Sequence, residues 1–224
     1  MRTCHHCGIC GVASPRKAGE DFTLETKAGV LAIGVAVSDD EGPLIVMDQG
    51  TSQFAAFNGS RDALAGALGI AESDLHVTLP IVYGSTGRWT LVVPIRDRAA
   101  MQRLRPIQAE FAAALCDKPD ASIHPFCSET IDPHASMHAR HFSSLGSGTL
   151  EDAVTGTASG VLGAYYRQFI DGSDGIEQPL VVEQGFEVGR EGSVQVWAAG
   201  QGGSYAVRIA GRGCFVEDIK IHLP

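Results

Sequence analysis

Short segments in which apolar and polar residues alternate, or in which apolar residues run together, recur along the chain. Residues 22–26 (Phe-Thr-Leu-Glu-Thr) alternate with a period of two, which is typical of a strand with one buried face. Residues 30–37 are almost entirely apolar, and the Asp-Asp-Glu-Gly-Pro cluster that follows at 39–43 is a turn signal. On these grounds we predict strands at 22–26, 30–37, 44–47, 89–95, 122–128, 137–142, 180–184, 194–198 and 205–209.

Helical patterns are fewer than strand patterns. Ser60 is a favourable N-cap for a short helix that Gly69 ends. A second helical stretch, 98–115, is interrupted by Pro106, and the longest helix is predicted over 154–170. Because strands and helices do not alternate regularly, the order favours an α+β fold over a doubly wound parallel sheet.

The predicted helix 154–170 carries three glycines, Gly156, Gly160 and Gly163. Glycine inside a helix costs about 1 kcal/mol relative to alanine, so this pattern needs a reason. Close approach of neighbouring chain supplies one. We therefore expect a buried central helix held by a curved sheet.

The composition limits the kinds of partner. The chain has 224 residues, is 44% hydrophobic and carries a net charge of −9, with a pI near 5.3. It is long enough for one large or two modest domains with a real core. The acidic balance argues against a nucleic-acid partner, which requires a basic face. A small anionic substrate remains compatible, because one local site can oppose the overall charge.

The sequence also argues against a membrane protein. Its longest apolar run, Gly29–Val37, falls far short of the roughly 20 residues that a membrane span needs. His5, His6 and Pro15 break any apolar core of a secretory signal. We expect a cytoplasmic protein whose six cysteines are reduced thiols.

Two carboxylates, Glu151 and Asp152, stand immediately before the small-residue helix. A helix N-terminus exposes unpaired N–H groups and suits a substrate carboxylate, which the Thr155 and Thr157 hydroxyls and the backbone at Gly156 can approach. Asp152 then has an acid/base role. In the alternative interpretation Asp152 is simply an N-cap and Glu151 a first-turn acid. The residues alone leave both open.

The same segment, from Leu150 to Gly160, resembles the signature of the PhzF-like family, Glu-Asp-Pro-x-Thr-Gly-Ser-Ala. Four other segments resemble family motifs in the family's order. They are Phe22-Thr-Leu-Glu-Thr-Lys-Ala-Gly-Val, Ser85-Thr86-Gly87 leading into Leu91-Val-Val-Pro, Arg140-His-Phe, and Glu183-Gln-Gly followed by Gly189-Arg. Together the pieces span about Phe22 to Gly211, and five in the correct order argue against coincidence.

The resemblance implies a DapF-like fold, in which two similar domains each wrap a curved mixed sheet around a central helix. On this basis we expect an atypical segment at 1–20, a partial first domain at 21–82 and a second domain at 83–224, whose last strand can return to the first. The implied activity is that of an isomerase or epimerase that relocates a proton on a small carboxylate-bearing metabolite, without a cofactor and commonly as a homodimer. The family members that are best understood act in phenazine biosynthesis.

The resemblance also assigns site residues. Asp152 matches the signature aspartate that assists acid/base chemistry. Gly156 and Thr157 match the glycine and serine that hold the substrate carboxylate, and Thr155 lies between these positions and Asp152. The motif Ser85, Thr86 and Gly87 is expected to bind substrate as well.

Departures from the family pattern change the expectation. Ala153 replaces the usual proline, and Thr157 replaces the usual serine. Nothing before Phe22 resembles the family's opening strands, its acid/base glutamate or its Gly-His-Pro-Thr segment. We therefore expect an incomplete first domain and impaired activity. The alternative is a non-catalytic small-molecule-binding remnant of the same fold.

Two-thiol racemases share this fold but need a cysteine at each edge of the site. This chain has Asp152 at the signature, and its cysteines at 116, 127 and 214 lie elsewhere, so that chemistry is set aside.

Metal sites are a third, weaker interpretation. The spacing of Cys4, Cys7 and Cys10 suits metal ligands and would make a regulatory module, but a structural zinc site needs four ligands. A looser cluster at residues 134, 138 and 141 is histidine-rich. In a strand, His138 and His141 point to opposite faces, which spoils a shared ligand set. We expect no metal site.

Overall fold

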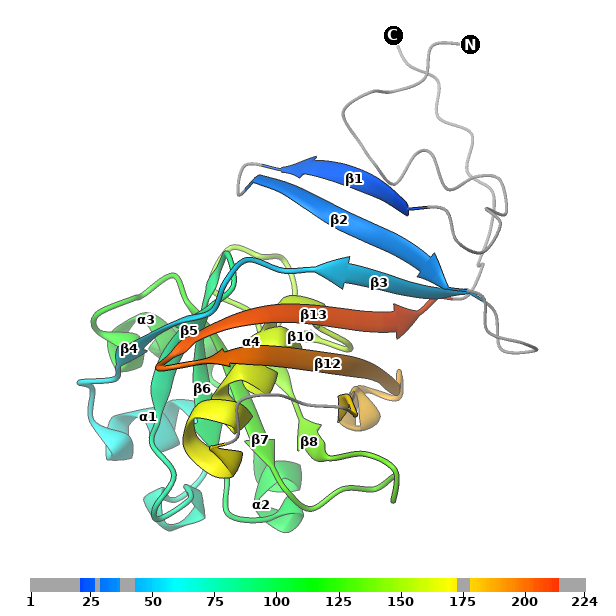
Figure 1. The fold of residues 1–224 in the computed structure, drawn as a ribbon. Helices are drawn as coiled ribbons and strands as arrows, with labels where there is room; N and C mark the ends of the chain where they lie inside the picture. Colours follow the sequence, from blue (N-terminus) through cyan, green and yellow to red (C-terminus); the bar gives the residue numbers. More distant parts are fainter. Residues whose placement is uncertain (1–20, 27–28, 37–42, 173–177, 214–224) are drawn as a thin grey trace, which may run out of the picture. The chain divides into compact units, whose positions relative to one another are not determined.

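The computed structural model describes residues 21–26, 29–36, 43–172 and 178–213, and divides into two units (Figure 1). The first unit comprises residues 1–47 and 210–224, and the second comprises residues 48–209. The cysteines at positions 4, 7, 10 and 214 lie outside the described residues.

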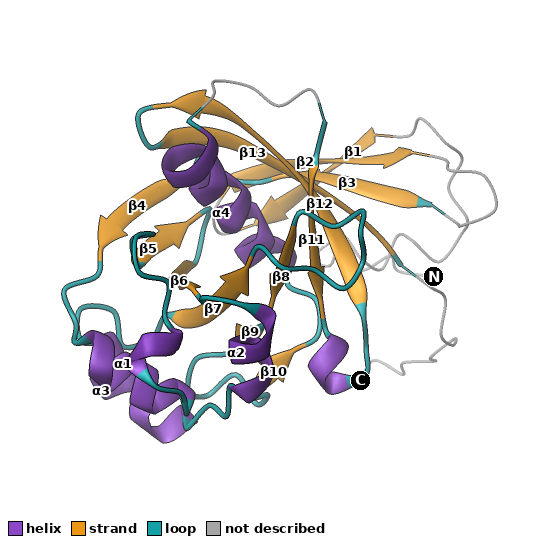
Figure 2. Ribbon diagram, turned by 90° about the horizontal axis from the view of Figure 1, so that it is seen from below, coloured by secondary structure: helices purple, strands orange, loops and turns teal. Residues whose placement is uncertain are grey.

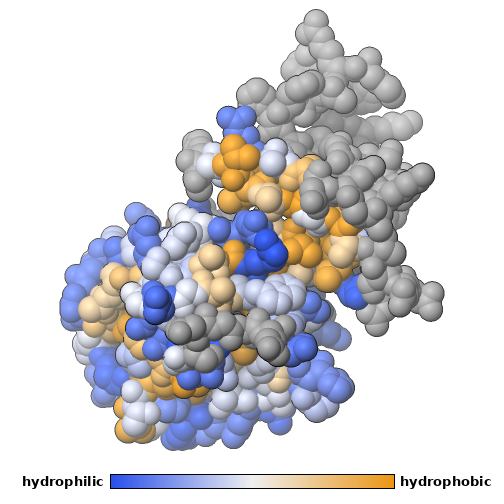
Figure 3. All heavy atoms as spheres, viewed as in Figure 1, coloured by the Kyte–Doolittle hydropathy of each residue, from blue (hydrophilic) through white to orange (hydrophobic). Residues whose placement is uncertain are grey.

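The first unit contains three antiparallel strands, β1 (Asp21–Thr26), β2 (Gly29–Ala36) and β3 (Leu44–Asp48). The strands predicted here are confirmed to within one residue at each described end. Ile33 and Val35 are buried, whereas Val30 at the hairpin end is 66% exposed. In Figure 3, apolar residues gather over the end of this hairpin. Among the large apolar side chains described in β2, Val30 is therefore the exposed one.

The second unit is built on a mixed sheet with the strand order β13-β12-β11-β8-β7-β6-β5-β4. Its strands are β4 (Gln53–Ala56), β5 (Val82–Ser85), β6 (Trp89–Pro94), β7 (Ser122–Cys127), β8 (Met137–Ala139), β11 (Leu180–Gln184), β12 (Gly192–Gln201) and β13 (Ser204–Arg212, within this unit to Ile209). The pairs β6/β7 and β8/β11 are parallel. A short antiparallel pair, β9 (His141–Phe142) and β10 (Glu151–Asp152), is attached to β7.

Three short helices cover one face of β5–β7 in Figure 2, namely α1 (Arg61–Leu68), α2 (Arg98–Arg103) and α3 (Phe111–Leu115). One hydrophobic core joins them to Leu91, Val93 and Ile123 of the sheet. Short 3-10 helices lie at Glu72–Asp74, Gln108–Glu110 and Phe186–Val188. The predicted helical stretch 98–115 is thus divided around Pro106, as expected from a residue that cannot donate a helical hydrogen bond.

The ends of α1 follow the expectation from sequence. The Ser60 side chain accepts a hydrogen bond from the Ala63 amide at 3.2 Å, which makes it a true N-cap. Gly69 ends the helix with a φ of 71°, a left-handed conformation that glycine adopts without a Cβ penalty.

The predicted helix 154–170 forms as α4 (Gly156–Tyr166), followed by a π-helical turn (Arg167–Asp171). The prediction of a buried helix is confirmed, because residues 158–165 are all buried, but its start at Val154 is wrong. Val154 is exposed and precedes the helix. Before the helix, Glu151 and Asp152 form β10.

Glycines let α4 lie close to the surrounding strands. A Cβ on Gly163 would stand 2.3 Å from Val196 of β12, and a Cβ on Gly160 would stand 3.0 Å from Val207 of β13. The neighbours are therefore valine side chains rather than backbone. Figures 1 and 2 show the sheet of this unit curving around α4. A mixed, strand-rich sheet with few helices confirms the α+β class.

The sequence pattern missed β4, β5 and β10. The domain boundary expected at 82/83 falls within β5, and the division into two similar DapF-like domains stays an expectation. None of the helices in the described part of the chain has the length and apolar character that a membrane crossing requires.

Candidate functional site

A cavity of about 430 Å³ opens at the N-terminal end of α4, within the second unit. Thr155 and Thr157 contribute from the start of the helix, His141 from β9 and Arg88 from the turn before β6. The loop 143–147 closes one side. Serines and threonines are the commonest lining residues, so the cavity presents mainly hydroxyl groups and suits a polar ligand.

Asp152 lies at the helix entrance but does not cap the helix. The N-cap position is Thr155, and no side chain in the described part of the chain caps α4. The Thr155 hydroxyl instead donates to Asp152 Oδ2 at 2.7 Å. The interpretation of Asp152 as an N-cap and Glu151 as a first-turn acid is therefore wrong, since both belong to β10. The first-turn amides of α4 remain available to an anion.

Gln184 fixes this entrance from the end of β11. It is 1% exposed, and its Nε2 donates to the Asp152 carbonyl at 2.7 Å. Its Oε1 accepts from the Thr155 amide at 3.3 Å. One buried amide thus holds the backbone on both sides of the turn into α4.

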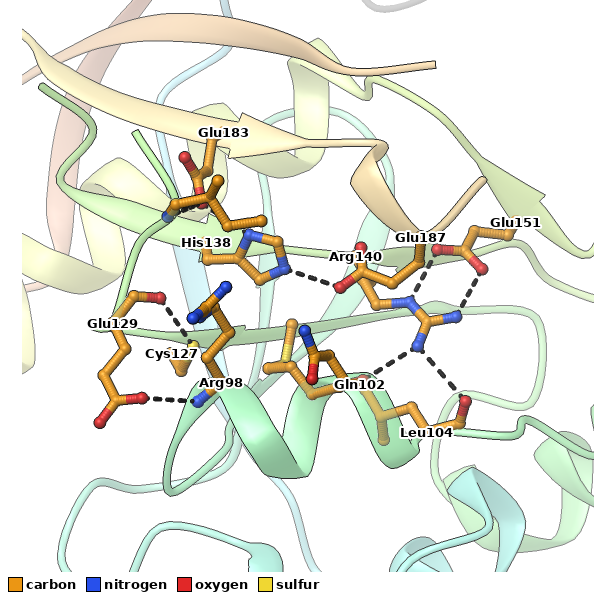
Figure 4. Close-up of polar contacts among 12 residues, drawn as sticks. Arg98, Gln102, Leu104, Cys127, Glu129, His138, Arg140, Glu151, Glu183 and Glu187 are labelled. Carbon is orange, nitrogen blue, oxygen red and sulfur yellow. Dashed lines mark hydrogen bonds and ion pairs between the residues drawn. The ribbon is translucent and has the colours of Figure 1, made fainter. Parts of the chain in front are cut away.

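A buried ion pair holds β10 in place. The Arg140 guanidinium bonds Glu151 through two parallel hydrogen bonds of 2.8 and 2.7 Å. Its remaining nitrogen donates to the carbonyls of Met101 and Leu104 at 3.0 and 3.3 Å (Figure 4). Since Asp152 directly follows Glu151, this pair sets the position of the candidate acid/base residue.

His141 stands across the β9/β10 ladder from Asp152, as its register partner. Burial lowers the pKa of His141 to about 4, and the nearby Asp152 acts in the opposite direction. His141 is therefore neutral at pH 7. In the sequence, His141 stands out only as a candidate metal ligand, because pairing between β9 and β10 leaves no signal there.

The structure brings some predicted site residues together and not others. Thr155 and Thr157 line the cavity, and Asp152 is bonded to the first of them. Gly156 does not line it, and a Cβ there would stand 2.7 Å from Cδ1 of Ile209, at the end of a flexible side chain of β13.

The Ser85-Thr86-Gly87 motif forms the turn between β5 and β6. The Ser85 hydroxyl accepts from the Gly87 amide at 3.1 Å, and Gly87 has a φ of 147°. None of the three lines the cavity, whereas the next residue, Arg88, does. Their expected role in substrate binding remains a prediction.

The histidines do not converge. His138 bonds Glu183 and Glu187 at 2.7 and 2.9 Å, while His141 faces His124 (Figure 4 shows His138). The single strand predicted at 137–142 is divided at Arg140 into β8 and β9, and His138 and His141 bond different partners. Among the described residues, no group of three or more histidine, cysteine or carboxylate side chains is arranged to hold a metal ion.

Comparison with known proteins identifies related chains. Residues 6–218 match the PhzC-PhzF family, described as phenazine biosynthesis-like protein. The uncharacterized isomerase YfhB of Bacillus subtilis is 39% identical over 225 residues, which cover 95% of this chain and 75% of that protein. The trans-2,3-dihydro-3-hydroxyanthranilate isomerase of Pseudomonas aeruginosa is 30% identical over 205 residues, covering 89% of this chain and 66% of that protein.

Solved structures agree with this grouping. A PhzF-family phenazine biosynthesis protein from Bacillus anthracis superposes with a TM-score of 0.84 at 40% identity, over 93% of this chain and 70% of that chain. A hydroxyproline epimerase from Agrobacterium vitis superposes with a TM-score of 0.54 at 11% identity, over 90% of this chain and 59% of that chain. The second likeness is one of fold alone.

Proposed function

Because this chain belongs to the PhzC-PhzF family of phenazine biosynthesis-like proteins, we propose that it is an isomerase or epimerase that relocates a proton on a small carboxylate-bearing metabolite without a cofactor. Its named relatives are isomerases. The observation that carries the proposal is the hydrogen bond between Asp152 and Thr155 at the uncapped N-terminus of α4, beside the cavity.

The N-terminus of α4 is the proposed site for the substrate carboxylate. Unpaired first-turn amides and the positive end of the helix dipole both favour an anion. The Thr157 side chain lines the cavity and can donate a further hydrogen bond, as the family serine at this position is expected to do. Arg88 adds a positive charge on the cavity wall, which offsets the acidic balance of the whole chain.

Asp152 is the proposed acid/base residue. As a carboxylate it accepts a proton from a substrate carbon, and as a carboxylic acid it returns that proton to another carbon or to the opposite face. The C–H bond that breaks is replaced by one that forms, so the reaction needs no oxidant. The Thr155 hydroxyl donates to Oδ2 and thereby orients the carboxylate. The other carboxylate oxygen, Oδ1, is not engaged by that hydroxyl.

Further parts of the proposal follow the family resemblance. They are a homodimer, a cytoplasmic location, and a substrate-binding role for the Ser85-Thr86-Gly87 turn. The alternative of a non-catalytic binding protein is not favoured, because the relatives are named isomerases. An assay of proton exchange separates the two.

The test is proton exchange in deuterated water. The chain is incubated with trans-2,3-dihydro-3-hydroxyanthranilate, the compound in the relative's name, and with a panel of small carboxylates. We expect deuterium incorporation at a rate reduced by the incomplete first domain, and an Asp152→Asn variant that is about 10²-fold slower again or worse. Asparagine keeps an oxygen that accepts from Thr155, so the turn should survive.

The matched control is Asp132→Asn, because Asp132 is an exposed aspartate whose Oδ1 accepts from the His134 amide. This variant should exchange at the unaltered rate. Exchange by Asp152→Asn at the rate of the control would remove Asp152 from the mechanism. Carboxylate binding with no exchange by the unaltered chain would favour the non-catalytic alternative.

A further inference from the structure

Two side chains with acid/base chemistry flank the entrance to α4, one on each strand of the β9/β10 ladder. Asp152 and His141 are direct register partners. Side chains of directly paired residues project from the same face with Cβ atoms about 4.5–5.5 Å apart. His141 lines the cavity, and Asp152 bonds Thr155 at its edge.

His141 is backed by a second buried imidazole. His124 of β7 is 0% exposed, and its Nδ1 lies 3.3 Å from His141 Nδ1. A single proton between the two Nδ1 atoms makes a hydrogen bond. Protons on both atoms would repel each other, and with no proton on either atom there would be no bond. The two rings must therefore adopt complementary tautomers.

The surroundings of His124 select one of the two arrangements. Its Nδ1 lies within hydrogen-bond distance of His141 Nδ1, while its Nε2 has no partner within the described residues. A proton on Nδ1 therefore meets an acceptor, and a proton on Nε2 would be a buried donor without a partner. Orphaned buried N–H groups are rarer than under-satisfied acceptors. His124 thus carries its proton on Nδ1 and donates to His141.

With its Nδ1 accepting, a neutral His141 carries its own proton on Nε2. That nitrogen has no hydrogen-bond partner among the described residues and is not among the buried unpaired atoms, so it is open to the cavity. Burial, and then the neighbouring His141, hold the pKa of His124 well below its usual value, and burial does the same for His141. Both rings are neutral at pH 7.

We propose that His141 is a second catalytic residue, which donates its Nε2–H to a substrate oxygen while Asp152 moves the proton, and that His124 is the positioning residue that fixes its tautomer. This inference rests on the proposed function. As the C–H bond breaks, the proton goes to Asp152 and the electron pair delocalises onto the substrate's carboxylate or carbonyl oxygen. The Nε2–H hydrogen bond stabilises that charge without transferring its proton, a task for which a neutral imidazole suffices.

The first test is independent of activity. Long-range ¹H–¹⁵N spectra of the imidazole rings distinguish the Nδ1–H and Nε2–H tautomers at neutral pH. We expect Nδ1–H for His124 and Nε2–H for His141, with the His141 Nε2 resonance shifting on addition of 2-aminobenzoate. The opposite tautomers, or a His141 resonance that 2-aminobenzoate leaves unmoved, would overturn the inference.

The second test uses the exchange assay with variants of His141. His141→Ala removes the donor and should lower turnover by about 10²–10³-fold, as loss of one preorganised donor does. His141→Gln keeps an N–H near the Nε2 position and should recover part of that loss. Melting curves are the check that both variants fold. His134→Gln, at an exposed histidine, is the control and should behave like the unaltered chain.

The positioning role of His124 predicts a separate kinetic effect. His124→Phe removes the donor that fixes the tautomer and should lower kcat about tenfold, with KM nearly unchanged, and the His141 spectra should show mixed tautomers. His124→Asn restores an N–H donor and should recover kcat. Unaltered exchange by folded His141→Ala would overturn the inference alone. Absence of exchange in the unaltered chain would overturn the proposed function with it.

Discussion

Arg140 and Glu151 face each other as a fork and a carboxylate, with Nε to Oε1 at 2.8 Å and Nη2 to Oε2 at 2.7 Å (Figure 4). Both side chains are buried, at 6% and 10% exposure. The Arg-x-Phe motif therefore has a structural purpose: its arginine fastens β10 beside β9. That pairing sets Asp152 opposite His141 at the entrance to α4.

Breaking this ion pair should cost much more stability than breaking an exposed one. Glu151→Gln leaves the buried guanidinium without its counter-charge, and we expect a loss of about 3–5 kcal/mol in the free energy of unfolding. Asp48→Asn breaks the exposed pair with Arg208, at 41% and 58% exposure, and should cost about 0–1 kcal/mol. Urea unfolding of the two variants checks this. Equal losses would show that the buried pair does not hold β10.

A second prediction concerns His138, which lies between Glu183 and Glu187. Burial lowers the pKa of His138, but the hydrogen bonds and charges of Glu187 and Glu183 outweigh it, so the pKa is raised above its usual value. For Glu187, burial raises the pKa, but the hydrogen bond and the charge of His138 outweigh burial, so the pKa of Glu187 is lowered. The protonated histidine is therefore the form that the fold stabilises.

The sign of the pH dependence follows from these directions. A raised folded pKa gives stabilisation that is fully present below the unfolded value of about 6.5 and is lost as pH rises through the folded value. The lowered pKa of Glu187 gives stabilisation that is present above about 4.5 and is lost on further acidification. The contribution should therefore be largest between about pH 5 and 6.5.

We expect His138→Gln to destabilise the protein more at about pH 6 than at about pH 9.5. The difference should be roughly 1.4 kcal/mol for each factor of ten by which folding strengthens proton binding at His138. Unfolding curves of both proteins at the two pH values measure it. His134→Gln, an exposed histidine, should show no such dependence. A destabilisation by His138→Gln that is the same at both pH values would show that His138 is not protonated in the fold.

A third prediction compares the effect of alanine on stability at two helical glycines, Gly163 and Gly66. A Cβ on Gly163 would stand 2.3 Å from Val196 Cγ1, so Gly163→Ala should cost about 1–3 kcal/mol despite alanine's better helix propensity. Gly66 in α1 is exposed and has nothing within 4 Å of an added Cβ. Gly66→Ala should therefore stabilise by about 0.4–1 kcal/mol. Opposite shifts in melting temperature would confirm both.

Space made by a second change tests the cause of the Gly163 effect. Val196→Ala removes the methyl groups that an alanine at 163 would meet. The double variant should therefore be more stable than the sum of the two single losses predicts, because the residues are in contact. Simple additivity would mean that the helix backbone, not Val196, requires glycine at 163.

The sequence by itself determined most of the local structure. Phe22 to Thr26 alternates with period two and forms a strand, since a strand's side chains point to alternate faces. Ser60 caps α1 because a hydroxyl can reach an unpaired amide within the next turn. The glycines of α4 predicted a buried helix, because close packing can compensate the free-energy cost of glycine inside a helix. The signature at 150–160 placed the candidate site at the start of that helix.

Only the tertiary structure decided what Asp152 does at that position. Locally, an aspartate before a helix resembles a cap, and sequence patterns record local preferences of this kind. The Arg140–Glu151 pair and the β9/β10 register instead draw Asp152 into a strand, opposite His141 and beside Thr155. These contacts join residues whose pairing no periodicity encodes, because the register between strands depends on which side chains can be buried and bonded together once the chain has folded.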